Sequence, residues 1–234
     1  MNTLSTLTPS LDRLLNGGFP KGYLSLIYGE ASTGKTTLCL QSAVSASRRN
    51  WKTLYIDADQ SFSHKRLIQI IGSSQNDVLE NILIFLPQSF LEQSRIVENL
   101  ENYLTKSIGL IVVDTVTSLY RTALGDRQGI FGLNRELNRQ LAYLVELASK
   151  YDLVVLITSQ VRSRVDDIEL RIEPVARRTL FHWPKTILNL RSTVKHNIKE
   201  ARLDTFQSQN VTKTRCYLKM MEEGLTDFNF HQSN

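Results

Sequence analysis

Short apolar runs alternate with longer amphipathic segments along the first two thirds of the chain. The apolar runs are Tyr23–Tyr28, Thr53–Ile56, Ile82–Leu86, Ile108–Val113 and Leu153–Thr158. Runs of this length that are apolar throughout predict strands buried on both faces, as in a parallel sheet.

The segments between these runs carry apolar residues at helical spacing. They predict helices over Lys35–Arg48, Phe62–Ile71, Phe90–Leu104 and Leu133–Ser149. Strands that alternate with helices predict right-handed crossovers and helices on both faces of the sheet. The fold class expected is therefore α/β, with a mostly parallel central sheet flanked by helices.

After Gln160 the alternation stops. Residues Val161–Thr179 are polar, charged and aperiodic, which predicts a long mobile loop of the kind that is usually functional. Further strands are expected at Ile187–Leu190, Cys216–Met220 and Leu225–Phe230, antiparallel at the edge of the sheet, with a hairpin loop over Thr205–Thr214.

Length and composition favour one globular domain in the cytoplasm. The 234 residues, 41% hydrophobic and 22% charged, fit one α/β domain better than two. No run of about 18 apolar residues is present, and Met1–Pro9 lacks the pattern of a signal peptide. Cys39 and Cys216 are interpreted as core thiols rather than a disulfide or a metal-binding pair.

The positive charge is concentrated towards the end of the chain. The net charge is +5, yet residues 161–219 hold 13 Lys and Arg against 6 Asp and Glu, an excess of 7. This excess favours a partner with a phosphate backbone. A solvated basic face without a partner is the alternative.

The strongest motif is Gly29-Glu30-Ala31-Ser32-Thr33-Gly34-Lys35-Thr36, placed between a predicted strand and a predicted helix. In this context G-x-x-x-x-G-K-T is a phosphate-binding loop, whose backbone N–H groups and helix N-terminus face phosphate oxygens. Lys35 would contact the β- and γ-phosphates of ATP, and Thr36 would ligate Mg²⁺. The residues expected to bind nucleotide are Gly29, Glu30, Ala31, Ser32, Thr33, Gly34, Lys35, Thr36 and Thr37.

Polar residues follow the predicted strands at their carboxyl ends, where ligands bind in such sheets. Asp114 is expected to hold Mg²⁺ together with Thr36. Asp57 or Asp59 could orient the attacking water, and the alternative is that both cap the next helix. Gln160 could sense the γ-phosphate, or could be only a polar strand end. Lys35, Asp59 and Gln160 are the catalytic candidates.

Taken in order, these elements resemble the RecA/RadA recombinase core. Leu11–Gly22 is similar to the family's approach to its first strand, Val112–Arg121 to its second motif, and Thr158–Val161 to its "TNQV" segment. The resemblance extends from about Thr8 to Phe230. It implies a RecA-like P-loop fold with ATP and Mg²⁺ as cofactors.

Full archaeal recombinases carry an N-terminal helical domain and a linker with a polymerisation motif, whereas this sequence begins at the core. A single RecA-like core domain is therefore expected over residues 1–234. That layout, with Leu180–Ile187, resembles the RadB group of archaeal paralogs. The resemblance implies a DNA-binding accessory protein of homologous recombination and DNA repair, with weak ATPase activity and no strand exchange of its own. The main archaeal recombinase and a junction nuclease are the protein partners considered, and a homo-oligomer stays open.

One residue departs from the family pattern. Asp59 stands where the family has its catalytic Glu, and the side chain is shorter by about 1.5 Å. A misplacement of about 1 Å can cost about a hundredfold in rate. The sequence therefore predicts slow hydrolysis, unless the backbone compensates.

Two DNA-binding loops are expected from the resemblance, at about Thr122–Asn134 and Arg162–Thr179. Their arginines suit single-stranded or branched DNA bound through phosphates with little sequence preference. The first aromatic residue is Phe131, so base stacking is expected to be poor. Alternatively, the acidic run Asp166-Asp167-Ile168-Glu169 pairs with these arginines, or they contact a protein. The arginines are Arg127 and Arg135 in the first loop, and Arg162, Arg164, Arg171, Arg177 and Arg178 in the second.

Two other functions compete with a DNA-coupled ATPase. The first is an ATP-dependent adaptor or scaffold that does not hydrolyse ATP and assists a recombinase or a nuclease. The second is a KaiC-like regulatory ATPase, against which the absence of a duplicated domain counts. Turnover that responds to DNA would distinguish the leading interpretation from the adaptor.

Overall fold

The computed structural model describes residues 2–72, 76–124, 129–163, 172–174, 176–206 and 214–228. The helices are α1 (Pro9–Leu14), α2 (Lys35–Ser47), α3 (His64–Ile71), α4 (Phe90–Glu98), α5 (Ser118–Ala123), α6 (Ile130–Tyr151) and α7 (Arg177–His182), with 3₁₀ turns η1 (Asn76–Asn81) and η2 (Leu100–Tyr103). The parallel strands are β3 (Tyr23–Gly29), β4 (Lys52–Asp57), β5 (Ile82–Phe85), β6 (Ile108–Asp114), β7 (Val154–Ser163) and β9 (Thr186–Ser192). The antiparallel strands are β8 (Ile172–Pro174), β10 (Ile198–Phe206), β11 (Arg215–Met221) and β12 (Gly224–Asp227), and a separate pair is formed by β1 (Thr3–Leu4) and β2 (Phe19–Pro20).

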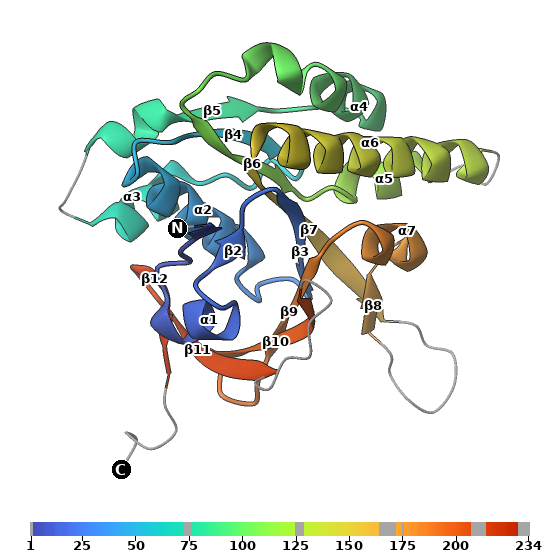
Figure 1. The fold of residues 1–234 in the computed structure, drawn as a ribbon. Coiled ribbons are helices and arrows are strands. Elements are labelled where there is room, and N and C mark those ends of the chain that lie inside the picture. Colours follow the sequence, from blue (N-terminus) through green and yellow to red (C-terminus); the bar gives the residue numbers. More distant parts are fainter. Residues whose placement is uncertain are drawn as a thin grey trace.

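The main sheet has ten strands in the order β12-β11-β10-β9-β3-β7-β6-β4-β5, with β8 paired to β7. Helices cover both of its faces (Figure 1). Side chains of α1, α2 and α3 join one core cluster, and those of α4, α5, α6 and α7 join the other. Strand β6 shows why its sequence is apolar throughout: Leu110 and Val112 enter the first cluster, while Ile111 and Val113 enter the second.

The α/β fold class predicted from the sequence is confirmed, and β3, β4, β5, β6 and β7 lie where the apolar runs placed them. The prediction for Ile187–Leu190 was wrong in direction and place: β9 pairs with β3 in parallel and lies inside the sheet, between β3 and β10. The edge strands β11 and β12 are antiparallel, as expected. No helix in the described part of the chain is long and apolar enough to cross a membrane.

Strand β10 was not predicted, and neither were the short strands β1, β2 and β8. Strand β10 lies between β9 and β11 and buries Ala201 and Leu203, while Arg202 and Asp204 face outwards. Its register with β9 shifts between Leu203 and Thr205, which interrupts the polar–apolar alternation. The expected hairpin loop thus starts later than Thr205, because β10 runs to Phe206; residues 207–213 lie outside the described part.

Both expected DNA loops are shorter than predicted. In the first, α5 continues to Ala123 and α6 already begins at Ile130, so Phe131 and Asn134 are helical. In the second, β7 runs to Ser163, pairs with β8, and is followed by α7 from Arg177. In the second loop, polar and charged residues interrupt the apolar pattern of β7, β8 and α7. Residues 125–128, 164–171 and 175 lie outside the described part.

Two predicted helices also have different limits. The helix expected at Phe62 begins at His64, because the Ser63 side chain accepts a hydrogen bond from the backbone N–H of Arg66 and caps the first turn. The helix expected over Phe90–Leu104 is divided: α4 ends at Glu98, and η2 follows.

Candidate functional site

The glycine loop connects β3 to α2 at the carboxyl edge of the sheet. A Cβ atom on Gly29 would lie 2.1 Å from the backbone oxygen of Leu190 in the neighbouring strand β9, so only glycine fits there. Gly34 caps α2 with φ of 103°, in the left-handed region that favours glycine. These two glycines give the loop the shape that its motif requires.

Lys35 is the first residue of α2 and is only 7% exposed. Its Nζ donates to the backbone oxygens of Gly29 (3.0 Å) and Glu30 (2.6 Å). Burial lowers the pKa of Lys35, and the nearby carboxylates of Asp114 and Asp59 act in the opposite direction. The loop therefore holds a desolvated amine between its own carbonyl groups and two acids, at the edge of a pocket.

Asp114 ends β6 and is completely buried. One carboxylate oxygen accepts from the Tyr55 hydroxyl (2.8 Å), and the other accepts from the Thr158 hydroxyl (2.5 Å). Burial and the charge of Asp114 raise the pKa of Tyr55 well above its usual value, so this phenol stays a donor. The Asp114 carboxylate is therefore fixed in position by strands on both sides.

The two acids after β4 differ in role. Asp57 is 1% exposed and accepts from the backbone N–H groups of Ser61 (2.9 Å) and Phe62 (2.8 Å). Burial raises the pKa of Asp57, although these two hydrogen bonds lower it. Asp57 thus holds the turn before α3, whereas Asp59 lines the pocket. Neither acid is the cap of α3, which is Ser63.

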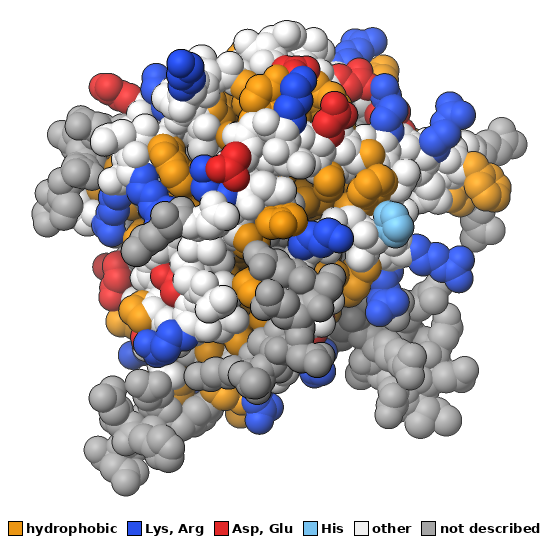
Figure 2. Space-filling model, viewed as in Figure 1, with side chains coloured by type: hydrophobic (Ala, Val, Ile, Leu, Met, Phe, Trp, Pro, Cys, Tyr) orange, Lys and Arg blue, Asp and Glu red, His pale blue; other side chains and the backbone are white. Residues whose placement is uncertain are grey.

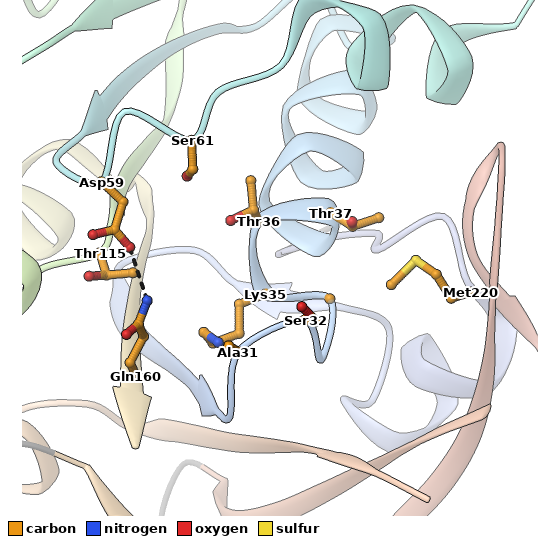
Figure 3. Close-up of a pocket in the computed structure, with 11 residues that line it drawn as sticks. Ala31, Ser32, Lys35, Thr36, Thr37, Asp59, Ser61, Thr115, Gln160 and Met220 are labelled. Carbon is orange, nitrogen blue, oxygen red and sulfur yellow. Dashed lines mark hydrogen bonds between the residues drawn. The ribbon is translucent and has the colours of Figure 1, made fainter. Parts of the chain in front are cut away.

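A pocket of about 250 Å³ lies between the glycine loop, the segment after β4 and the end of β7. Figure 3 shows Lys35 and Thr36 from the loop and α2 facing Asp59 and Gln160 across it. The amide Nε2 of Gln160 donates to Asp59 at 3.3 Å. The predicted residues that line it are Ala31, Ser32, Gly34, Lys35, Thr36, Thr37, Asp59 and Gln160, whereas Gly29, Glu30, Thr33 and Asp114 do not line it directly.

Three lining residues were not predicted: Ser61, Thr115 and Met220. Met220 comes from β11, and its Sδ lies 3.1 Å from a guanidinium nitrogen of Arg66 in α3. No local pattern could have indicated a residue from a distant edge strand. Thr115 could have been found, because it follows Asp114 directly.

The arrangement of oxygen groups fits a magnesium ion beside a phosphate. Thr36 and Thr115 line the pocket, and the buried Asp114 immediately precedes Thr115 in the chain. Among the described residues, the buried hydroxyl oxygen of Thr115 has no hydrogen-bond partner, which makes it an unsatisfied polar group beside the pocket. Hard oxygen donors of this kind are the ligands that Mg²⁺ prefers.

Gln160 is held from a second direction. Nη1 of Arg121, in the last turn of α5, donates to Oε1 of Gln160 at 2.8 Å. The amide therefore bridges Arg121 and Asp59, and is more than a polar strand end. Arg121 was part of the family resemblance, but the sequence did not single it out for this contact.

Three of the predicted DNA-binding arginines are described with their side chains, and all three are exposed. Arg135 lies on α6, and Arg177 and Arg178 lie on α7. Arg177 stacks over the ring of Phe181 at 4.9 Å. In Figure 2 basic side chains occupy the right-hand side, where α7 and the start of α6 lie. Phe131, at that start, is 92% exposed.

The side chains of the other predicted arginines lie outside the described part of the structure. The backbone of Arg162 belongs to β7, but its side chain is not described. Outside the described residues lie Arg127, Arg164 and Arg171, and the acidic residues Asp166, Asp167 and Glu169.

Fold and site together define a RecA-like α/β protein with a phosphate-loop pocket at the carboxyl edge of its sheet. The chain belongs to the Rad51 family, whose sequence model matches residues 1–228. Both predicted levels of resemblance, to the RecA/RadA recombinases and to RadB, are confirmed by this match and by the relatives.

The relatives are proteins named "DNA repair and recombination protein RadB". The one from Methanococcoides burtonii is 40% identical over 190 residues, which cover 81% of this chain and 83% of the relative. The one from Thermococcus kodakarensis is 34% identical, covering 96% and 99% of the two chains. A crystal structure of the RadB recombinase matches with a TM-score of 0.81 and 33% identity, covering 97% of this chain and all of that one.

Proposed function

We propose that this chain is an ATP-binding, DNA-binding accessory protein of homologous recombination and DNA repair. In this proposal its ATPase activity is weak, and it performs no strand exchange of its own. The observation that carries the proposal is the pocket, in which Lys35 and Thr36 face Asp59 and Gln160. The names of the relatives support the role in recombination and repair.

In the proposed mechanism, the loop backbone and Lys35 bind the ATP phosphates, and Thr36 and Asp114 hold Mg²⁺. Bound there, the ion would supply positive charge to neutralise the charge that develops on the phosphates. Lys35 moves its donated hydrogen bonds from the carbonyls of Gly29 and Glu30 to phosphate oxygens. Asp59 orients the attacking water, and Gln160 contacts the γ-phosphate.

Weak hydrolysis is supported by the environment of Asp59. Its side chain is about 1.5 Å shorter than the glutamate of the family. One of its oxygens already accepts a hydrogen bond from Gln160, which leaves fewer lone pairs for a water. The Asp59 side chain is thus shorter than glutamate, and one of its oxygens is already hydrogen-bonded.

DNA binding is proposed for the exposed arginines of α6 and α7. Arg135, Arg177 and Arg178 would contact phosphates without reading the bases, on single-stranded or branched DNA. The main archaeal recombinase or a junction nuclease is the protein partner proposed, in the cytoplasm.

The test is steady-state hydrolysis of ATP with Mg²⁺, with and without single-stranded DNA, for wild type, Lys35→Ala and Lys52→Ala. Lys52 serves as the matched control, because it is an exposed lysine at the first residue of β4, at the strand end opposite the pocket. Loss of the Lys35 ammonium is expected to lower turnover by about 100- to 1,000-fold, because a preorganised charge on the phosphates is removed. Wild-type turnover that rises with DNA, with Lys52→Ala unchanged, would support the proposal.

The same geometry favours one alternative, an ATP-dependent adaptor without hydrolysis, because Asp59 is engaged by Gln160. ATP binding without turnover, indifferent to DNA, would establish the adaptor and reject the ATPase. Neither the geometry of the site nor the names of the relatives support a KaiC-like regulatory ATPase.

A further inference from the structure

Three side chains from three separate elements form a chain of hydrogen bonds that leads out of the pocket. Arg121 of α5 donates to Oε1 of Gln160 at 2.8 Å, and Nε2 of Gln160 donates to Oδ2 of Asp59 at 3.3 Å. Gln160 lies in the last part of β7, and Asp59 follows β4 (Figure 3 shows the Gln160–Asp59 bond). The inner end of this chain is the proposed water-orienting acid, and the outer end is an exposed arginine.

Arg121 determines which way the Gln160 amide faces. A guanidinium group can only donate hydrogen bonds, so it must take the amide oxygen. The amide nitrogen is then turned towards Asp59, whose ionised carboxylate can only accept. The bond to Arg121 is also the shorter of the two, so the amide is held more firmly by Arg121 than by Asp59.

The backbone that carries Arg121 is anchored, so its side chain is the part that can move. The neighbouring Tyr120 is buried, packs edge-on against Phe90 and donates to Asn134 of α6 at 2.7 Å. Just before α5, the backbone N–H of Val116 donates to the oxygen of Thr158 in β7. These contacts fix α5 between β7 and α6.

The Gln160 amide is a weaker partner for the Arg121 guanidinium group than an anion would be. Among the residues that the structure describes, no carboxylate lies within ion-pair distance of Arg121, and its recorded side-chain acceptor is a neutral amide. The bond to Gln160 has one charged partner, whereas a phosphate adds an opposite charge and oxygens that can accept from the guanidinium group in a bidentate way. A phosphate that reaches Arg121 is therefore a stronger acceptor than the Gln160 amide and competes with it for the guanidinium N–H groups.

We propose that Arg121 is a phosphate-responsive positioning residue that holds Gln160 against Asp59 until a nucleic-acid phosphate takes its guanidinium group. Release of Arg121 lets the Gln160 amide leave Asp59, which frees the carboxylate to orient water and the amide to contact the γ-phosphate. DNA thereby raises turnover without touching the pocket. This inference rests on the proposed function, and it names the residue through which DNA would act on the ATP site.

The experiment compares kcat of wild type, Arg121→Ala, Gln160→Ala and the double variant, each without DNA and with saturating single-stranded oligothymidine. Arg121→Ala is expected to raise DNA-free kcat by about three- to tenfold, the factor that one hydrogen bond of ordinary strength represents. DNA should then add nothing further. In the Gln160→Ala background, Arg121→Ala should have no effect, because residues that act through one another are not additive.

Two more variants complete the design. Arg121→Lys, which keeps one donor for the amide oxygen, should restore part of the DNA response. Arg139→Ala removes another exposed arginine, on α6, whose partners are Glu98 and Glu136, and should leave both rates unchanged. Inorganic phosphate at matched concentration tests whether a free anion has the same effect as DNA. Stimulation by oligothymidine but not by inorganic phosphate assigns the effect to the DNA strand.

Low DNA-free turnover in Arg121→Ala with full stimulation at saturating DNA would overturn the inference and make Arg121 an ordinary DNA ligand. Additive losses in the double variant would also overturn it and make Arg121 structural. If wild type does not turn over at all, the ATPase of the proposed function fails. The inference is then decided by ATPγS affinity: DNA must change it in wild type and not in Arg121→Ala, since coupling between two ligands is reciprocal.

Discussion

The two sides of the pocket are built differently. On one side, Lys35 lines the pocket, and Lys35 and the nearby Asp114 are both buried and each held by two hydrogen bonds of 2.5–3.0 Å. On the other side, Asp59 and Gln160 are only partly buried and share one bond of 3.3 Å, with Arg121 exposed behind them. The side proposed to bind phosphate is thus preorganised, and the side proposed to direct hydrolysis is held more loosely. In the proposed function, the first side holds the nucleotide and the second controls its hydrolysis.

The largest effect should come from disturbing the fixed side. In Gly29→Ala the new methyl group would lie 2.1 Å from the backbone oxygen of Leu190, which no change of rotamer relieves. The strands β3 and β9 must separate, so the free energy of unfolding should fall by about 1–3 kcal/mol or more. Chemical denaturation measures this loss, and the affinity for ATP should fall with it.

Gly132→Ala is the matched control for that substitution. Gly132 lies inside α6, and a Cβ there meets nothing within 4 Å. Alanine is the better helix former by about 1 kcal/mol, so stability should be unchanged or slightly higher. Equal losses in both variants would show that the loop is not especially rigid.

A smaller effect is expected from lengthening the acid on the adjustable side. Asp59→Glu extends the carboxylate by about 1.5 Å, to the length that the family uses. If arm length limits hydrolysis, kcat should rise by about 10- to 100-fold, while the dissociation constant for ATP changes little. Single-turnover kinetics separate kcat from the dissociation constant for ATP. Asp59→Asn is the control and should lose the remaining rate. An unchanged kcat would mean that the backbone already compensates for the short arm.

The smallest effects should come from the exposed arginines outside the pocket. Arg135→Ala and Arg178→Ala should each weaken single-stranded DNA binding by a similar factor for all sequences, and should lower the slope of log K against log salt by about one unit. Fluorescence anisotropy at several salt concentrations measures both. A slope that does not change would assign these arginines to a protein partner or to solvent.

The pocket also shows what a sequence can predict about this molecule. The phosphate loop, Asp59 and Gln160 could be placed because each lies close to the end of an apolar run, and parallel strands bring their carboxyl ends to one edge of the sheet. The resemblance carried by Val112–Arg121 and Thr158–Val161 correctly indicated the RecA-like fold and the family.

The features that were missed depend on contacts across the sheet. Strand β10 exposes Arg202 and Asp204 on one face and breaks its register, so its sequence lacks a clean alternation. Met220 reaches the pocket only because β11 folds back beside the loop. The link from Arg121 to Gln160 joins residues 39 positions apart, and no local pattern encodes such a contact.

The side chain of Gln41 in α2 joins the two ends of the fold. Its Oε1 accepts from the backbone N–H of Leu225, and its Nε2 donates to the oxygen of the same residue, across 184 positions of sequence. The Thr8 hydroxyl donates to that oxygen as well. During synthesis on the ribosome, the glycine loop emerges well before the β11–β12 wall beside it. The pocket is therefore completed only once β11 has been translated, and nascent fragments that end before β11 carry the motif without the finished site.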